Sequence, residues 1–224
     1  LKRMADSYRR IRNTARFLLG NLNGFDPATD ALPTDRLLAF DRWAIARARD
    51  VQAEVMAAYE SFEFHRIYQR LLNFCVVDMG GLYLDVLKDR LYTTRADSDA
   101  RRSAQTALMH IAEALTRGLA PIMPFTADEI WQALPGERAG SVMLSVWHEF
   151  PTDVSADDVD WDDASAVRGA GSRQIEALRA SNDVGSSLEA EVTVYTADAL
   201  GEALAPLESE LRFLLLPSTA EVRP

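Results

Sequence analysis

The sequence predicts a mainly α-helical protein: a helix bundle over residues 1–148, an acidic linker over 149–163 and a small α/β subdomain over 164–224. Two observations lead to this prediction. Before residue 135, apolar residues recur three or four positions apart in five segments, which is the period of a helix with one buried face. After residue 187, apolar and polar residues alternate, which is the period of a half-buried strand.

The first two helices are predicted over residues 2–22 and 41–59. The apolar stripe of the first helix consists of Met4, Tyr8, Ile11, Ala15, Leu18 and Leu22. The turn-forming pairs Asn23-Gly24 and Asp26-Pro27 follow it. The residues of the second helix that are expected in the core are Ala44, Ala48, Val51, Val55 and Ala58.

The third segment has the longest apolar stripe in the chain. Its members are Tyr68, Leu71, Leu72, Cys75, Val76, Met79, Leu82, Tyr83 and Val86. Gly80-Gly81 lies within this stripe, although each glycine costs about 1 kcal/mol relative to alanine in an exposed helix. We therefore expect the helix to bend at this pair or to have another backbone close by.

The fourth helix is predicted to begin after Ser98, a suitable N-cap, and to end at Pro121, which cannot continue a helix. Its inward residues are Ala104, Leu108, Ile111, Leu115 and Leu119. The fifth helix is predicted to end before Pro135-Gly136. For its start we expect an N-cap at Thr126, a capping-box partner at Glu129 and a hydrophobic staple between Phe125 and Ile130.

The C-terminal part is predicted as helix, strand, helix and strand. The apolar residues Val167, Ile175 and Leu178 indicate the first helix, and residues 188–195 alternate as a strand does. A second helix is expected over 198–207, broken or tilted near Pro206, and a buried strand over 211–216. The acidic run before this part is typical of a solvated linker, and it lacks the glycine turn of a calcium loop.

Charge is distributed unevenly along the chain, whose net charge is −10. Residues 149–224 hold 16 acidic and 5 basic residues, so residues 1–148 hold 18 acidic and 19 basic ones, a net charge of +1. Screening acts over about 8–10 Å at physiological salt, so a polyanion bound to the first part would hardly sense the acidic part. The average charge therefore does not exclude a nucleic-acid partner.

Most catalytic signatures are absent from the sequence. It has no phosphate-binding glycine loop, nucleophile elbow or zinc-protease spacing, and none of the histidines at 65, 110 and 148 follows a glutamate by three positions, as di-iron bundles require. His110 and Glu113 are expected to form a surface pair.

The lone Cys75 excludes an internal disulfide and fits a reducing compartment, so we expect a cytoplasmic protein. No apolar run reaches the roughly 18–20 residues of a membrane span, so no membrane partner is expected. We predict no catalytic residue and no metal ligand.

Two basic groups are candidates for contact with RNA. Lys2, Arg9, Arg12 and Arg16 share one flank of the first helix, with Arg3 and Arg10 on another side. The second cluster consists of Lys88, Arg90, Arg101 and Arg102, where the third segment connects to the fourth helix. The residues predicted to bind RNA are Arg9, Arg12, Arg16, Lys88, Arg90, Arg101 and Arg102. Tyr92 is either a base-stacking surface or a core residue. A merely solvated basic face is the alternative to binding.

Several strings resemble one enzyme family. They are RNTARFLLGNLNGFDP at 12–27, DRWAIAR at 41–47, FCVVDMGGLYLDVLKDRLY at 74–92, RRSAQTAL at 101–108 and PFTADEIWQALPG at 124–136. Together they resemble the region after the catalytic core of bacterial class I isoleucyl-tRNA synthetases. Looser similarity continues through 176–195 and 211–218, which are similar to that family's small C-terminal junction subdomain.

The resemblance implies a fold and a task. The fold is the helix-bundle anticodon-binding domain of class I synthetases, and the task is to hold the anticodon stem-loop of isoleucine tRNA. The family activates isoleucine with ATP and Mg²⁺, and some members carry a C-terminal zinc module. This sequence lacks the His-Ile-Gly-His and Lys-Met-Ser-Lys-Ser signatures, the editing insert and that module, and it opens without Met. We therefore expect part of a longer chain, with no cofactor of its own and a catalytic domain of the same parent chain as a partner.

Two alternatives remain open at this stage. The first helix, with Asn13 and Thr14, could face the catalytic domain rather than RNA. The whole chain could instead be a helical protein–protein interaction scaffold without RNA binding.

Overall fold

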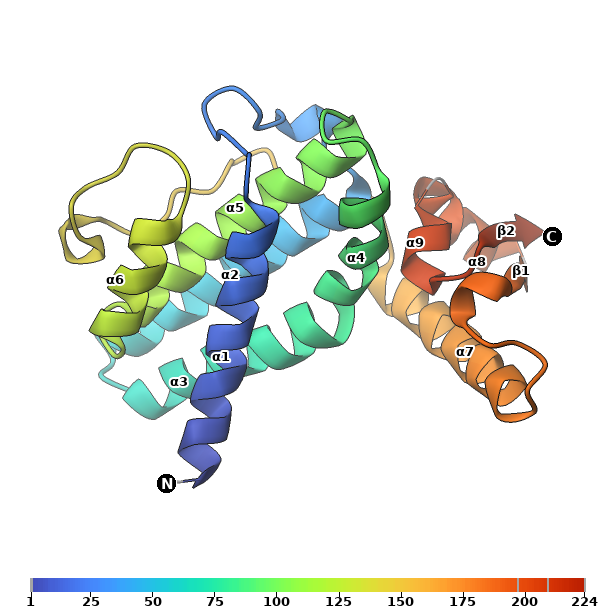
Figure 1. Ribbon diagram of the computed structural model, residues 1–224, viewed down its shortest axis with the longest axis horizontal. Coiled ribbons are helices and arrows are strands. Elements are labelled where there is room, and N and C mark those ends of the chain that lie inside the picture. The colour runs from blue at the N-terminus through green and yellow to red at the C-terminus, as the bar shows by residue number, and fades with distance from the viewer. Residues whose placement is uncertain (1, 197, 209, 224) are drawn as a thin grey trace. The chain divides into compact units, whose positions relative to one another are not determined.

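A computed structural model describes residues 2–196, 198–208 and 210–223. The chain forms two compact units, Leu1–Val154 and Ser155–Pro224. Their boundary falls within the segment 149–163 that the acidic run predicts as a linker. Both units are mainly helical, with one small sheet in the second (Figure 1).

The first unit is a bundle around one central helix. Its α-helices are α1 (Lys2–Asn21), α2 (Ala39–Glu60), α3 (Phe64–Asn73), α4 (Leu84–Thr93), α5 (Asp99–Leu119) and α6 (Pro124–Ala133). Short 3₁₀ turns lie at Thr34–Arg36 and Val142–Leu144. Helix α5 contacts the other five, and 14 of its 21 residues are buried. Many of those residues are alanine, which allows the surrounding helices to approach closely.

The structure confirms the first, second and fourth predicted helices. In α1 the stripe is buried from Ile11 onward, whereas Met4 and Tyr8 remain 57% and 40% exposed. All five core residues predicted for α2 are buried, and so are all five predicted for α5. The Ser98 side chain caps α5 by accepting a hydrogen bond from the backbone N–H of Arg101.

The predicted start of the fifth helix is wrong. Helix α6 begins at Pro124, because proline has a helical φ and lacks the N–H that a first-turn residue cannot use. Thr126 therefore lies inside the first turn, with its hydroxyl 3.2 Å from the hydroxyl of Tyr8. Glu129 pairs with Arg12 instead of closing a capping box. Phe125 is 91% exposed, so it does not form the expected hydrophobic staple with Ile130.

The third predicted helix is continuous, but it is not α-helical throughout. Between α3 and α4 lies a π-helical segment, Phe74–Tyr83, after which the N–H of Leu84 bonds to the carbonyl of Met79, five residues earlier. A Cβ on Gly80 would lie 3.1 Å from the carbonyl oxygen of Cys75. The close backbone expected at the glycine pair is therefore the segment's own, brought near by the wider π turn.

A buried carboxylate joins four segments of this unit. Asp41 in α2 is fully buried and accepts hydrogen bonds from the Tyr83 hydroxyl at 2.7 Å, from the Arg90 guanidinium of α4 and from the Ser103 hydroxyl of α5. The Ser103 oxygen also accepts the backbone N–H of Leu38 at 2.9 Å, just before α2. An unpaired buried charge is costly, so these donors fix how the segments pack.

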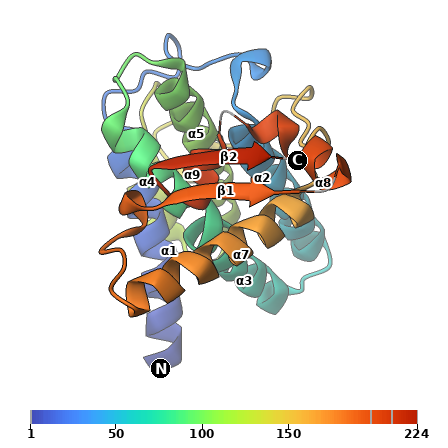
Figure 2. The same cartoon turned by 90° about the vertical axis from the view of Figure 1, so that its right-hand side faces the viewer.

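The second unit is a small α/β structure. It contains α7 (Trp161–Ala180), β1 (Glu191–Tyr195), α8 (Asp198–Leu204), α9 (Leu211–Leu215) and β2 (Thr219–Arg223). The strands run parallel, with Glu191 opposite Thr219 and Tyr195 opposite Arg223 (Figure 2). A 3₁₀ turn, Ala205–Leu207, follows α8, which confirms the break predicted near Pro206.

One element of this unit was predicted wrongly. Residues 211–216 form helix α9 and its C-cap, not a strand, and the second strand is β2. The run LRFLLL is nearly all apolar, so it carries no period that separates a buried strand from a short buried helix. The helix ends where Leu216 takes a left-handed conformation, with φ of 63°.

Replacing Arg90 by methionine is expected to lower the free energy of unfolding by about 3–5 kcal/mol, because Asp41 would keep a buried charge without its cation. Urea unfolding followed by circular dichroism measures this change. The matched control is Arg95→Met, because Arg95 is 82% exposed and its loss should change stability by less than about 0.5 kcal/mol. Equal losses in the two variants would contradict the role of the buried pair.

The two neighbouring glycines should respond differently to alanine. Gly81→Ala is expected to raise the free energy of unfolding by about 1 kcal/mol, since its Cβ would meet the nearest carbonyl oxygen at an ordinary 3.5 Å. Gly80→Ala should gain less or lose stability, because its contact with the Cys75 carbonyl is tighter. The same urea experiment compares the two, and a larger gain for Gly80→Ala would refute the assignment of the tight turn.

Candidate functional site

The described residues offer no cluster suited to metal chemistry. No group of three or more His, Cys, Asp or Glu side chains among residues 2–196, 198–208 and 210–223 is arranged to hold a metal ion. None of the helices in that part of the chain is long and apolar enough to cross a membrane.

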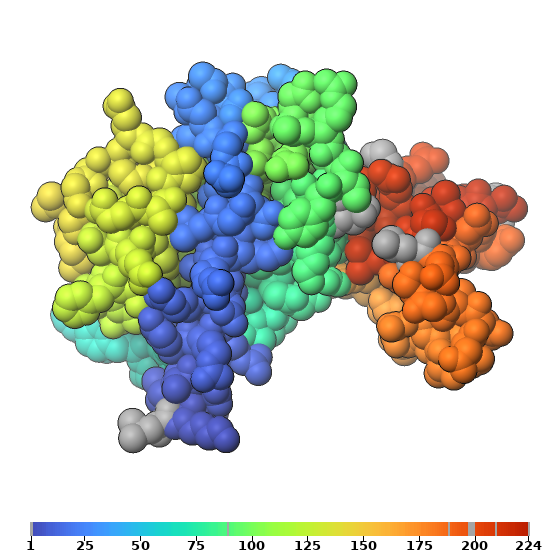
Figure 3. Space-filling view, in the orientation of Figure 1, coloured from blue at the N-terminus to red at the C-terminus, as the bar shows by residue number. Residues whose placement is uncertain are grey.

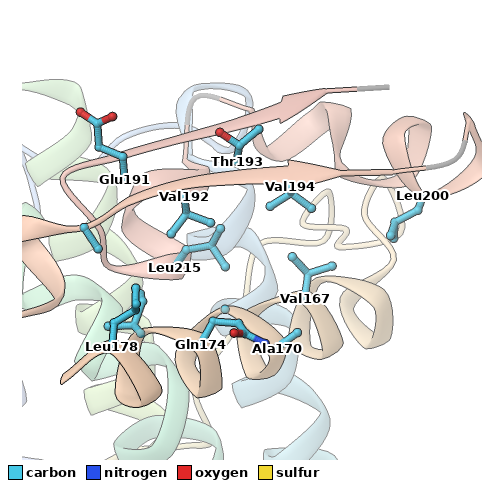
Figure 4. A pocket seen from close by; sticks show the side chains of 13 residues that line it. Val167, Ala170, Gln174, Leu178, Glu191, Val192, Thr193, Val194, Leu200 and Leu215 are labelled. Atoms are coloured by element: carbon cyan, nitrogen blue, oxygen red, sulfur yellow. The ribbon is translucent and has the colours of Figure 1, made fainter. Parts of the chain in front are cut away.

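The second unit contains an apolar groove of about 460 Å³. Figure 4 shows Val192 and Val194 of β1 directed toward Val167 and Leu178 of α7 across this groove. Glu191 is the one titratable residue in its described lining. The groove therefore brings together no acid–base pair that could catalyse a reaction.

The histidines are arranged differently from the prediction. His110 does not form a surface pair with Glu113: its Nδ1 lies 2.8 Å from Nε2 of His148, while Glu113 pairs with Arg117 and Arg138. The His148 ring packs edge-on against Phe150, with centroids 4.7 Å apart. Burial is the main cause that lowers the pKa of both rings, and it lowers the pKa of His148 to about 3. The two rings therefore hold the segment after α6 against α5 as neutral groups.

A row of cations runs along the outer side of α1. Lys2, Arg9 and Arg16 are exposed and stand seven residues apart, so they lie almost in line with about 10.5 Å between successive Cα atoms. This row is opposite the buried stripe of Ile11 and Leu18. In the space-filling view α1, in blue, runs down the visible face of the first unit (Figure 3).

The cations of α1 differ in how far they are engaged. Arg9 pairs with Asp6 at 3.1 Å, but its side chain is 68% exposed and such surface pairs stabilise by at most about 1 kcal/mol. Arg16 has no ion pair or side-chain hydrogen bond in the described structure, and neither has Lys2. The row is therefore free to bind an anion.

Arg12 is not part of this free row. Its guanidinium binds Glu129 of α6 through two hydrogen bonds of 2.6 Å each, and it lies 3.4 Å from the Tyr8 hydroxyl. The hydrogen bonds to Glu129 are the main cause that raises the pKa of Arg12, and the hydrogen bonds from Arg12 lower the pKa of Glu129. We conclude that Arg12 connects α1 to α6, and its predicted contact with RNA is not favoured.

The second predicted basic cluster does not form one surface. Arg90 is 1% exposed and paired with Asp41, so its prediction as an RNA contact is wrong. Arg102 pairs with Asp30 at 3.1 Å, and Arg101 donates to the carbonyl of Leu91 at 2.8 Å. Both side chains hold the start of α5 in place.

The exposed members of this region are Lys88 and Tyr92. Lys88 pairs with Asp85 at 3.1 Å but keeps 56% of its side chain exposed. Tyr92 is 68% exposed, so the core role that the sequence left open for it is excluded. Of the seven residues predicted to bind RNA, Arg9, Arg16 and Lys88 are therefore the ones that present exposed cations.

The prediction of RNA-binding residues from the sequence missed some of the exposed cations on α1. Lys2, Arg3 and Arg10 of α1 are exposed, and the described residues offer their side chains no partner. The signal was present, because Lys2 belongs to the seven-residue spacing of Arg9 and Arg16. A helix bundle with such a row of exposed cations has the geometry of a binding domain for a polyanion.

The comparison with protein families agrees with this class. The sequence profile of the anticodon-binding domain of tRNA ligase matches residues 41–194, more than half of the chain. The chain belongs to this family.

Individual relatives match over the whole chain. It is 59% identical over 225 residues to an isoleucine–tRNA ligase of Halorhodospira halophila, covering 99% of this chain and 24% of that protein. It is 55% identical over 228 residues to one of Pseudomonas aeruginosa strain PAO1, covering 100% of this chain and 24% of that protein. An Alkalilimnicola ehrlichii isoleucine–tRNA ligase is 56% identical over 226 residues, with 99% and 24% covered. The chain spans about a quarter of the length of these relatives.

The histidine pair predicts a dependence of stability on pH. The folded chain disfavours protonation of His148, whereas the unfolded chain takes up that proton near pH 6.5. The free energy of unfolding is therefore fully retained above about pH 6.5 and falls below it, by at most about 1.4 kcal/mol per pH unit for one proton. Urea unfolding at about pH 7.5 and about pH 5.5 measures the loss.

His148→Gln is expected to reduce that dependence, because glutamine does not titrate and can still hydrogen-bond to His110. The control is His65→Gln, since His65 is exposed on α3 and its loss should leave the dependence unchanged. An unchanged dependence in His148→Gln would show that other groups cause it.

Proposed function

We propose that this chain binds the anticodon stem-loop of isoleucine tRNA in the cytoplasm. In this proposal a catalytic domain of the same parent protein uses ATP and Mg²⁺ to attach isoleucine while this chain holds the tRNA. Membership of the anticodon-binding family and the similarity to isoleucine–tRNA ligases support the choice of RNA. The observation that supports the mechanism is the exposed row of Lys2, Arg9 and Arg16 on α1, in which Arg9 has only a surface pair with Asp6.

Phosphate contacts would supply the affinity. Each contact releases counterions condensed on the RNA, so binding weakens as salt rises. The acidic average of the chain does not argue against such binding, because residues 1–148 hold 19 basic and 18 acidic residues and the excess of carboxylates follows them in the sequence. Guanidinium and ammonium groups on a helix position the RNA backbone but do not read its sequence.

The alternative for α1 is contact with the catalytic domain, and the burial of one residue argues against part of it. Thr14 is buried, with its hydroxyl 3.2 Å from the carbonyl of Arg10 and 3.4 Å from that of Cys75, so it cannot face another domain. Asn13 is exposed and compatible with either partner. The scaffold alternative has little support, because most of the predicted apolar stripes of the first unit are buried against one another rather than presented at the surface.

Arg9→Gln and Arg16→Gln are each expected to weaken binding of an RNA stem-loop with the sequence of that anticodon arm. Each should also lower the slope of log affinity against log salt by about 0.7–0.9, because one phosphate contact is lost. Fluorescence anisotropy at several salt concentrations measures both quantities.

Arg66→Gln provides the matched control, because Arg66 is 64% exposed on α3, outside the row. It should leave the slope unchanged. The proposal fails if the chain does not bind the stem-loop, or if all three variants behave alike. Absence of stem-loop binding would leave the scaffold alternative, and salt-independent binding of the stem-loop would show that phosphate contacts do not supply the affinity.

A further inference from the structure

The KDRLY string ends in an aromatic ring that has no role in the core. Leu91 is 1% exposed, and Arg90 is buried and paired with Asp41. The side chain of Tyr92, the next residue, is 68% exposed. Among the described residues it makes no ring contact and no side-chain hydrogen bond. An aromatic side chain stabilises a fold mainly by the area it buries, so this ring contributes little to stability.

The backbone that carries Tyr92 is held firmly. The Arg101 guanidinium donates to the carbonyl of Leu91 at 2.8 Å, and the Thr94 hydroxyl donates to the carbonyl of Arg90 at 2.6 Å. These bonds satisfy carbonyls at the C-terminal end of α4, which a helix leaves without partners. The ring therefore stands on a fixed turn, which reduces the entropy lost when it binds a flat ligand.

A cation lies beside the ring. Lys88 precedes Tyr92 by four residues in α4, so the two side chains share one face of the helix. The pairing of Lys88 with Asp85 is exposed on both sides, and a phosphate could replace the carboxylate at little cost. An exposed ring with an adjacent exchangeable cation suits a nucleotide that offers one base face and one phosphate.

The position of Tyr92 also fits the end of the cation row. Gln105 donates to the carbonyl of Asn21 at the end of α1 with a distance of 2.9 Å, and Arg101 reaches the end of α4. The C-terminal end of α1 thus contacts α5 at Gln105, and the C-terminal end of α4 contacts it about one turn earlier, at Arg101. An RNA strand that follows α1 from its N-terminus therefore reaches the first two turns of α5, which also hold the end of α4 that carries Tyr92.

We propose that Tyr92 stacks on one unpaired base of the RNA loop while Lys88 contacts a neighbouring phosphate. This inference rests on the proposed function. Stacking on an aromatic ring needs an unstacked base, so the ligand is a loop nucleotide and not the paired stem. The α1 row positions the stem, and Tyr92 makes the contact that distinguishes a loop from a duplex.

The test uses the anticodon-arm stem-loop with 2-aminopurine at each loop position in turn, together with a blunt duplex of the same stem. The unsubstituted chain should quench the fluorescence at one loop position, because stacking on an aromatic ring quenches that base. Tyr92→Ala should abolish this quenching and weaken stem-loop binding about 5- to 150-fold, while duplex binding stays unchanged. Tyr92→Phe and Tyr92→Trp should retain both properties, because each keeps an aromatic face.

Phe125→Ala is the matched control, since Phe125 is 91% exposed on α6 and stands four residues before the acidic Glu129. It should bind and quench like the unsubstituted chain. Urea midpoints should be equal for both alanine variants, because neither side chain is buried.

Three results would overturn the inference. If the chain binds the stem-loop but Tyr92→Ala binds and quenches equally, the stacking contact is refuted and the proposed function stands. If Tyr92→Ala weakens stem-loop and duplex binding alike, the ring does not contact a loop base. If the unsubstituted chain binds neither RNA, the proposed function fails first and the inference fails with it.

Discussion

The packing of the first unit depends on one buried charge. Asp41 is fully buried, and Tyr83, Arg90 and Ser103 donate hydrogen bonds to it from three other segments. The same interaction sets the surface. Because Arg90 points inward, the positions two before and two after it in α4 point outward, which is where Lys88 and the exposed ring of Tyr92 lie.

The helical spacing of apolar residues and the N-cap at Ser98 predicted most of the bundle. This works because a helix with one buried face needs apolar residues three or four positions apart. The errors occur where that rule does not apply. The nearly all-apolar LRFLLL at 211–216 has no period, and α6 begins at Pro124, before the cap that the sequence indicated at Thr126. The π turn is defined by its backbone hydrogen bonds, which the pattern of apolar residues does not reveal. The pair Gly80-Gly81 nevertheless indicated that the helix is irregular at this position.

The site was predicted less completely than the fold, for an electrostatic reason. A sequence shows which residues are cationic, but pairing is decided by segments far apart in the chain. Arg12 meets Glu129 across 117 positions, and Arg90 meets Asp41 across 49, so neither is available to a ligand. Arg16 and Lys2 have no ion pair among the described residues, which only the folded structure reveals.

The wide turn at Phe74–Tyr83 has a consequence for how related chains should be compared. A π turn holds more residues than an α turn, so loss of one residue there can be absorbed by ordinary α-helical winding without rotating the residues downstream. The Arg90 guanidinium would then still face Asp41, and Lys88 and Tyr92 would still point outward. A relative with a one-residue gap between the DRW and KDRLY strings should therefore have a plain α-helix over this interval, whereas one extra residue that the winding does not absorb would turn α4 by about 100°.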